Sequence, residues 1–326
     1  MFTGRDLLQK NHVDEAMNAL QGGLALAEGN LWSGDLVRAL REEIHHAERL
    51  KAAQELHLLI ERIRPYYGVE ALLPSEARAV ESRCRRLWDM RNWIIHQLES
   101  QAEFANLARS ERATAHELDQ QLQADLLDLA ILWTDLRVRL VAEEGQVANL
   151  THRQEALAVL DQAELLFGPS CVLHEERQTH LMALGMANGT RSAAATAQRS
   201  ESVPAPRTAW EHYALGRIFF RAGDLPSASS YFQRALQLQP EGFWPNFYWG
   251  QCAYQQARYD DAVLAFSACV VLAPNRALCF YNRGLAYSML GKSDRALLDF
   301  DQSLRLDPDL AGAALSRRNL LDQGNP

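Results

Sequence analysis

The sequence lacks the features that mark membrane, secreted and metal-binding proteins. Nowhere do about 18 apolar residues follow one another without a charge, and the N-terminus has no basic start followed by an apolar core, so neither a membrane span nor a signal peptide is expected. The five cysteines are scattered, odd in number and without a C-x-x-C pair, which argues against a disulfide framework. We therefore predict a cytoplasmic protein with reduced thiols and with no metal site or cofactor.

Basic clusters and catalytic motifs are also missing. The 33 lysines and arginines against 41 acidic residues give a formal net charge of -8, which repels a phosphate backbone, so nucleic acid is not an expected partner. His174 and His180 are six residues apart and do not form an H-E-x-x-H zinc motif. Glu143 and Glu144 are consecutive, and consecutive helical side chains point about 100° apart, which is unsuited to paired acid and base catalysis. We predict a chain without catalytic residues.

Helical periodicity, by contrast, extends from end to end of the sequence. There is no sustained alternation of apolar and polar residues and there are few runs rich in Val, Ile and Thr, so the predicted fold class is all-α. In the first part of the chain Leu, Ala, Glu and Arg dominate, and the predicted helices end at glycine, before proline or in a polar stretch. These predicted helices span 34–67, 75–108, 114–143, 152–167 and 171–186.

A change in composition divides the chain in two. Between 189 and 207 the sequence GTRSAAATAQRSESVPAPR loses its periodicity and its large apolar residues, which is typical of a flexible linker. Of the 27 Phe, Trp and Tyr residues, 18 lie in 208–310. We therefore predict a helical region at 1–188, a linker at 189–207 and a separate domain at 208–322.

Past this linker the sequence repeats with a period of 34 residues and without a gap. The identical columns are Gly216, Gly250 and Gly284; Ala228, Ala262 and Ala296; Phe232, Phe266 and Phe300; Leu238, Leu272 and Leu306; and Pro240, Pro274 and Pro308. Small residues allow two helices to approach closely, and proline ends a helix because it cannot donate a backbone hydrogen bond. The spacing therefore predicts three successive copies of one structural unit, each ended by a proline.

This pattern resembles the tetratricopeptide repeat, and Leu215 and Tyr287 fill further positions of it. The resemblance implies an α-solenoid in which each repeat is a pair of antiparallel helices, at 209–222 and 225–238 in the first repeat. The implied units are repeats at 209–242, 243–276 and 277–310 and a capping helix at 311–322.

The first 188 residues contain weaker traces of the same pattern. The segment 153–169 has the form of a second helix followed by a terminal proline, and the apolar segment LLDLAILWTDLRVRL precedes it. Gly4, Ala16 and Leu20 keep the spacing of the glycine, alanine and phenylalanine columns. We expect degenerate, TPR-like helical hairpins across 1–188, and we hypothesise that the chain begins inside a repeat of a longer protein.

A second resemblance provides an alternative. The runs WEHYALGRIFF, EGFWPNFYWGQCAY and YNRGLAYSMLGKSDRALLDFDQSL are similar to the repeat-bearing C-terminal regions of large bacterial serine/threonine protein kinases. This resemblance covers about a third of the chain and implies a regulatory or sensor tail that recruits substrates or regulators to a catalytic domain. The sequence has no Gly-rich loop, H-R-D or D-F-G motif, so kinase activity would belong to another domain.

The tetratricopeptide resemblance implies that a protein or peptide, of unknown identity, binds in a concave groove lined by the first helix of each repeat. Residues two, five, nine and twelve into each first helix share about one face. The predicted lining is therefore Trp210, Tyr213, Arg217, Phe220, Trp244, Phe247, Gln251, Tyr254, Leu278, Tyr281 and Leu285. Buried aromatic residues and arginine are frequent at interfaces, whereas packing within the core is the alternative for each individual ring.

Tetratricopeptide domains that bind acidic chaperone C-termini use lysine, asparagine and further basic residues on their first helices. This sequence has Tyr213 and Arg217 at the first pair of those positions, Tyr248 at the next, and Leu278 with Asn282 at the last. Binding of an acidic tail is therefore not expected.

Overall fold

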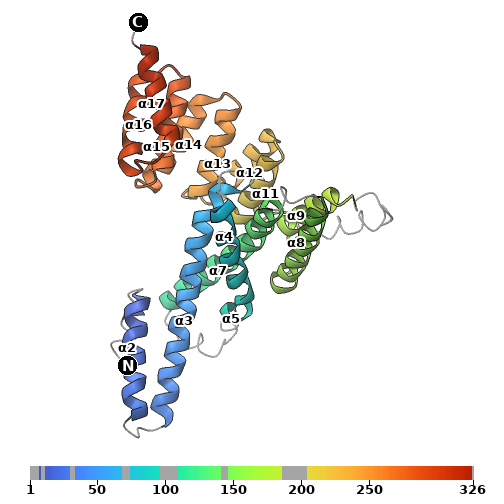
Figure 1. The fold of residues 1–326 in the computed structure, drawn as a ribbon, viewed down its shortest axis with the longest axis vertical. Helices are drawn as coiled ribbons and strands as arrows, with labels where there is room; N and C mark the ends of the chain where they lie inside the picture. Colours follow the sequence, from blue (N-terminus) through green and yellow to red (C-terminus); the bar gives the residue numbers. More distant parts are fainter. Residues whose placement is uncertain are drawn as a thin grey trace. The chain divides into compact units, whose positions relative to one another are not determined.

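The all-α prediction is confirmed over the part of the chain that the structure, a computed structural model, describes (Figure 1). The described residues are 7–8, 12–29, 34–67, 74–95, 109–140, 146–185 and 204–324. Within these ranges there is no strand, and no helix is both long enough and apolar enough to cross a bilayer. The chain forms two compact units, Met1–Gly168 and Pro169–Pro326.

The first unit is built from helices of very different lengths. Helices α2 (Val13–Gly29) and α3 (Gly34–Ile63) form a hairpin, and α3 continues into the single 3-10 turn η1 (Arg64–Tyr66). The other described helices of this unit are α4 (Pro74–Asp89), α5 (Arg91–Ile95), α7 (Arg109–Leu140) and α8 (Gln146–Phe167). Because α3 has 30 residues and α7 has 32, this unit does not share the short, equal hairpins of the 34-residue period.

Helix α7 forms the centre of the first unit. Residues 125–136 of this helix are all buried, and α3, α4 and α8 pack around it. Burial on every side requires an apolar surface all round the helix, which the segment LLDLAILW provides apart from one aspartate.

The prediction of a single helix at 75–108 is wrong. A turn at Met90 separates α4 from α5. The Arg91 guanidinium donates a hydrogen bond to the backbone carbonyl of Trp88 at 2.7 Å and lies 4.9 Å from the Trp88 ring centroid, so the carbonyl left open at the end of α4 is satisfied. Residues 96–108 of the predicted helix lie outside the described residues.

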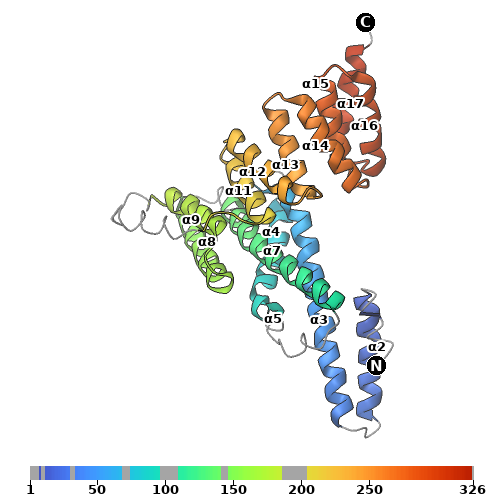
Figure 2. The same cartoon turned by 180° about the vertical axis from the view of Figure 1, so that it is seen from behind.

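The second unit is a row of short helix pairs (Figure 2). Helix α9 (Cys171–Ala183) precedes them, and α17 (Ala311–Gly324) follows them. The three hairpins are α11 (Ala209–Arg221) with α12 (Leu225–Leu238), α13 (Phe243–Gln255) with α14 (Tyr259–Leu272), and α15 (Ala277–Met289) with α16 (Ser293–Leu306). The bounds of α11 and α12 agree with the predicted helices to within one residue.

Each hairpin is closed by a contact between a glycine on its first helix and a phenylalanine on its second. A Cβ atom added at Gly216 would lie 2.5 Å from the ring of Phe232, and one added at Gly250 would lie 2.7 Å from the ring of Phe266. Phe232 is buried, and it also stacks on Tyr248 of the next repeat with 5.7 Å between ring centroids. Because glycine has no Cβ atom, the two helices pack closely and the phenylalanine ring fills the space that a side chain would occupy.

The turn inside each hairpin requires one residue in the left-handed region. Gly223 has a φ of +80° and Gly291 a φ of +69°, whereas the second repeat places Ala257 there with a φ of +57°. The next backbone N–H, that of Arg258, donates to the carbonyl of Ala253 at 2.8 Å and closes the helix end. A side chain is disfavoured in this conformation, so the second repeat carries local strain that the other two avoid.

We predict that Ala257→Gly raises the free energy of unfolding by roughly 1 kcal/mol, because glycine adopts the left-handed conformation without steric cost. Urea unfolding followed by tryptophan fluorescence measures the change. The matched control is Gly223→Ala, which introduces the same strain into the first repeat and should lower stability by a similar amount. Equal stability of all three proteins would contradict the prediction.

The two compact units divide after Gly168 rather than within the predicted linker at 189–207. Helix α9 packs against α11, and the Arg221 guanidinium pairs with the fully buried Glu176 at 3.0 Å. A buried ion pair of this kind ties α9 to the first repeat, so residues 171–183 belong with the second unit and not with 1–188. Residues 186–203, most of the predicted linker, lie outside the described residues.

Helix α17 stands where the first helix of a fourth repeat would stand, packed against α15 and α16. Arg318 lies 34 residues after Gly284 and is exposed. A side chain at this position would occupy the place of the phenylalanine ring of a following second helix, so α17 cannot form the same close hairpin.

Candidate functional site

The first helices of successive repeats contact one another directly, α11 with α13, α13 with α15, and α15 with α17. They therefore present a continuous surface that runs across the repeats. We call the predicted lining residues on these helices the first-helix surface. Its members differ widely in how accessible they are.

Three of the predicted lining residues are core residues in the structure. Tyr213, Trp244 and Phe247 are buried in the aromatic core of the repeats, where the Tyr213 ring lies 6.1 Å from that of Tyr248 and the Phe247 ring 5.9 Å from that of Phe266. The prediction placed them in the groove lining, with packing within the core as the alternative for each ring. They are covered because Tyr248, a residue outside the predicted lining, brings rings from adjacent helices together.

Arg217 is also buried among the helices of the repeats. Its side chain is fully buried and its guanidinium lies 4.7 Å from the centroid of the Tyr213 ring, a cation–π contact. A buried guanidinium over an aromatic face contributes to packing between α11 and its neighbours. Arg217 is therefore placed for a structural role rather than for direct contact with a ligand.

The remaining members reach the surface. Leu278 is 38% exposed, and Phe220 packs edge-on against Tyr248 at 5.5 Å while staying half-buried. Tyr254 is half-buried, with its ring 5.5 Å from that of Tyr259, and burial raises the pKa of its hydroxyl above the usual value, so Tyr254 stays neutral. The other half-buried members are Trp210, Gln251, Tyr281 and Leu285.

Two side-chain amides link adjacent repeats on this surface. Gln251 Nε2 donates to Asn282 Oδ1 at 2.9 Å, and Asn282 Nδ2 donates to the backbone carbonyl of Leu278 at 2.8 Å. Both side chains are half-buried. Asn282 was not among the predicted lining residues, although its place directly after Tyr281 on the third first helix could have indicated it.

The first-helix surface has no exposed charge. Helix α13 contains no charged residue. The charges on α11 and α15 are engaged: Arg221 pairs with Glu176, Arg283 with Asp299 at 2.8 Å, and Glu211 closes the capping box at the start of α11. Apolar contacts and amide hydrogen bonds are what this surface offers to a ligand.

In the described part of the chain the cysteines are buried, and the metal-capable side chains are not grouped. All five cysteines are buried, and burial raises the pKa of both Cys84 and Cys252 to about 12, so these thiols stay protonated. The described residues contain no grouping of three or more His, Cys, Asp and Glu side chains suited to a metal ion.

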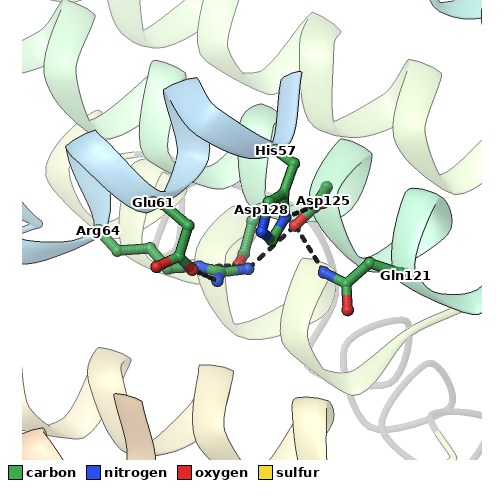
Figure 3. Close-up of polar contacts among 6 residues, drawn as sticks. All are labelled: His57, Glu61, Arg64, Gln121, Asp125 and Asp128. Atoms are coloured by element: carbon green, nitrogen blue, oxygen red, sulfur yellow. Dashed lines mark hydrogen bonds and ion pairs between the residues drawn. The ribbon is translucent and has the colours of Figure 1, made fainter. Parts of the chain in front are cut away.

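A second candidate is a buried group of charged side chains between α3 and α7 of the first unit (Figure 3). The Arg64 guanidinium donates to Asp128 at 2.9 Å and to Asp125 at 3.1 Å, and it also bonds Glu61. Asp125 further accepts hydrogen bonds from Gln121 at 3.1 Å and from His57 at 2.8 Å. Since both aspartates are almost fully buried, their charge is compensated by these partners and not by water.

These contacts assign the group a structural role. Each carboxylate of Asp125 and Asp128 is engaged by the guanidinium that joins η1 to α7, so neither is open to a substrate. Loss of one partner from a buried ion pair costs about 3–5 kcal/mol. A shift of α3 along α7 that separated these charged side chains would therefore be strongly unfavourable.

We predict that His57 makes the first unit more stable in mild acid. The hydrogen bond to Asp125 is the main cause of a raised His57 pKa; Asp125 and Glu61 add electrostatic attraction, while burial and Arg64 oppose it. Because the folded-state pKa lies above the unfolded value, the stabilisation is complete below the unfolded pKa of 6.5 and is lost as the pH rises through the folded pKa. Urea midpoints between about pH 5.5 and 8.5 should show this fall.

The variant His57→Gln should reduce that dependence, because the amide can still donate to Asp125 but does not titrate. His45→Gln, on an exposed part of the same helix, is the matched control. A pH profile that is the same in His57→Gln and in the natural sequence would show that another group is responsible.

Comparison with family models identifies the repeats. Tetratricopeptide repeat models match residues 182–243, 213–277 and 277–310. Residues 182–310 contain tetratricopeptide repeats. The TPR match at 277–310 has the limits of the third repeat expected from the 34-residue period, and the matches begin at the end of α9, the helix that packs on the first TPR hairpin.

Similar proteins also carry TPR units. A tetratricopeptide repeat and J domain-containing co-chaperone, DNJ1, from Cryptococcus neoformans is 29% identical over 107 residues, which are 33% of this chain and 18% of the relative. This chain therefore matches less than a fifth of the length of that curated relative.

Two solved structures of TPR proteins are similar to this chain. The first TPR domain of Spaghetti (RPAP3), bound to the HSP90 peptide SRMEEVD, is 18% identical with a TM-score of 0.36, covering 36% of this chain and 94% of that one. YrrB, a TPR protein with an unusual peptide-binding site, is 20% identical with a TM-score of 0.39, covering 62% of this chain and 97% of that one. Because both TM-scores lie below 0.5, the assignment depends on the family models and on the hairpin geometry.

Proposed function

We propose that the first-helix surface binds an uncharged segment of a partner protein, and that the chain acts as a non-catalytic interaction scaffold. The observation that carries the proposal is the character of the accessible side chains on three successive first helices. They are aromatic, aliphatic or amide side chains, with no exposed charge among them. Aromatic rings at accessible positions supply large contact areas at low entropic cost, as at many protein interfaces.

The amide pair adds the polar part of the proposed recognition. With Nε2 of Gln251 donating to Asn282, the Gln251 carbonyl oxygen still has acceptor capacity and each amide nitrogen has a second hydrogen. These groups match the N–H and C=O groups of an extended peptide backbone. Phe220, Tyr254 and Leu278 would then contact apolar side chains of the same peptide.

An acidic C-terminal tail is not the proposed ligand. The positions that would hold a carboxylate carry Tyr213 and Arg217, which are buried, and Leu278 and Asn282, which are uncharged. The HSP90 peptide in the similar RPAP3 domain is acidic, so the proposed ligand class differs from that one. The alternative role as the regulatory tail of a kinase stays a prediction from sequence resemblance.

The test is selection from a displayed peptide library with the full chain, followed by fluorescence-polarisation measurement of the enriched peptides. We expect uncharged sequences with aromatic and aliphatic residues. Leu278→Asp and the pair Gln251→Ala with Asn282→Ala should each weaken binding by at least about tenfold, because these side chains lie at the centre of the proposed contact.

The matched controls are Leu238→Asp and Gln255→Ala, which change exposed residues outside the first-helix surface and should leave the affinity unchanged. Trp244 and Phe247 are unsuitable for this test because their truncation would open the core. Enrichment of acidic peptides, or equal weakening by the controls, would contradict the proposal.

A further inference from the structure

Helix α14, the second helix of the middle repeat, is apolar on all sides. It has no charged residue from 262 to 275, beyond its first turn. Its inner side is buried, through Ala262, Phe266 and Cys269 among others. A helix that is apolar all round normally has neighbours on every side, so the outer side of α14 is expected to be covered as well.

That outer side is open in the single chain. Leu264 is 63% exposed and Val271 is 80% exposed, with the half-buried Ala268 between them. The spacing i, i+4, i+7 aligns the three residues in one stripe along the helix. Burial of a stripe of this kind against another apolar surface would be favourable.

The neighbouring second helices show that the repeat fold does not require this stripe. Each second helix packs its inner side on two first helices, α12 on α11 and α13, α14 on α13 and α15, and α16 on α15 and α17. Their outer sides therefore face the same way. The α12 residues that correspond to the stripe are Ser230, Arg234 and Gln237, and those of α16 are Leu298, which is 68% exposed, Gln302 and Arg305.

We infer that the outer face of α14 and α16 is an interface with a second copy of this chain, with the two α14 helices packed antiparallel about a two-fold axis. The stripe suits this arrangement, because large, small and large residues follow one another in both directions. Leu264 of one copy then meets Val271 of the other, and the two Ala268 residues face each other at the crossing, where small side chains allow close approach.

The charges on α16 complement one another in the same arrangement. Asp294 is exposed in the first turn of α16 and Arg305 is exposed in the last. Asp294 lies four residues before Leu298 on the same side of α16, whereas its neighbour Arg295 lies over the Tyr287 ring at 5.6 Å. Antiparallel packing brings Asp294 of one copy toward Arg305 of the other, twice across the axis, and it sets the helix dipoles antiparallel. Asp260, at the corresponding end of α14, is paired with Lys292 at 3.4 Å.

This interface is separate from the proposed peptide-binding surface. The first-helix surface belongs to α11, α13 and α15, whereas the inferred interface belongs to the outer sides of α14 and α16. Dimerisation would therefore leave both first-helix surfaces open and would make the scaffold bivalent, which raises its avidity for a multivalent partner.

Sedimentation velocity of the full chain between about 1 and 100 μM tests the inference. We expect a reversible monomer–dimer equilibrium in which Val271→Glu and Leu264→Glu each weaken association at least about tenfold, since either places a charge in the apolar contact. Leu165→Glu, at an 86% exposed leucine of α8, is the matched control and should not change it. Val271→Ser, with thermal melting as a check on folding, gives a second variant of the same residue.

Charge exchange distinguishes this interface from any other. Asp294→Arg and Arg305→Asp should each weaken the dimer, because each sets like charges together, and the two changes combined should restore it. A chain that is monomeric at about 100 μM would overturn the inference and assign the stripe to a different protein. A dimer that is unaffected by Val271→Glu, or not rescued by the combined exchange, would overturn it as well.

Discussion

The contact between a glycine on each first helix and a phenylalanine ring on the following second helix is the constraint on which the second unit depends. It fixes how close the two helices of a hairpin come, and with that the rotation of each helix about its own axis. The same contact recurs at Gly216, Gly250 and Gly284, so each hairpin presents the same sides to its neighbours. The corresponding position of α17 is Arg318, so α17 cannot make this contact.

The regular rotation of the helices decides which side chains are available for binding. Residues that face the glycine–phenylalanine contact become core, and Tyr248 extends this core from one repeat to the next. Accessible rings such as Phe220 and Tyr254 are the ones left at the margin of that core. The proposed binding surface therefore depends both on which aromatic residues are buried in the core and on which remain accessible.

The first unit is held together by different means. Its centre is the long helix α7, whose residues 125–136 are buried on all sides, and its specific register comes from the charged group around Arg64. An apolar helix can slide or rotate against its neighbours with little change in buried area, whereas two buried aspartates have one favourable position opposite one guanidinium. Protonation of His57 adds to that preference, so the stability of this unit is tied to pH.

The all-α class, the 34-residue period and the bounds of α11 and α12 could be predicted from the sequence because periodicity, glycine and proline act locally. The fate of individual rings could not be predicted: Trp244 and Tyr254 both lie on the predicted face of α13, yet only the neighbouring helices determine that one is core and the other accessible. The pairing of Gln251 with Asn282, the attachment of α9 to the repeats and the exposure of Val271 likewise depend on contacts between segments distant in the chain. Those contacts arise only when the helices pack, and they decide which side chains remain accessible on the repeats.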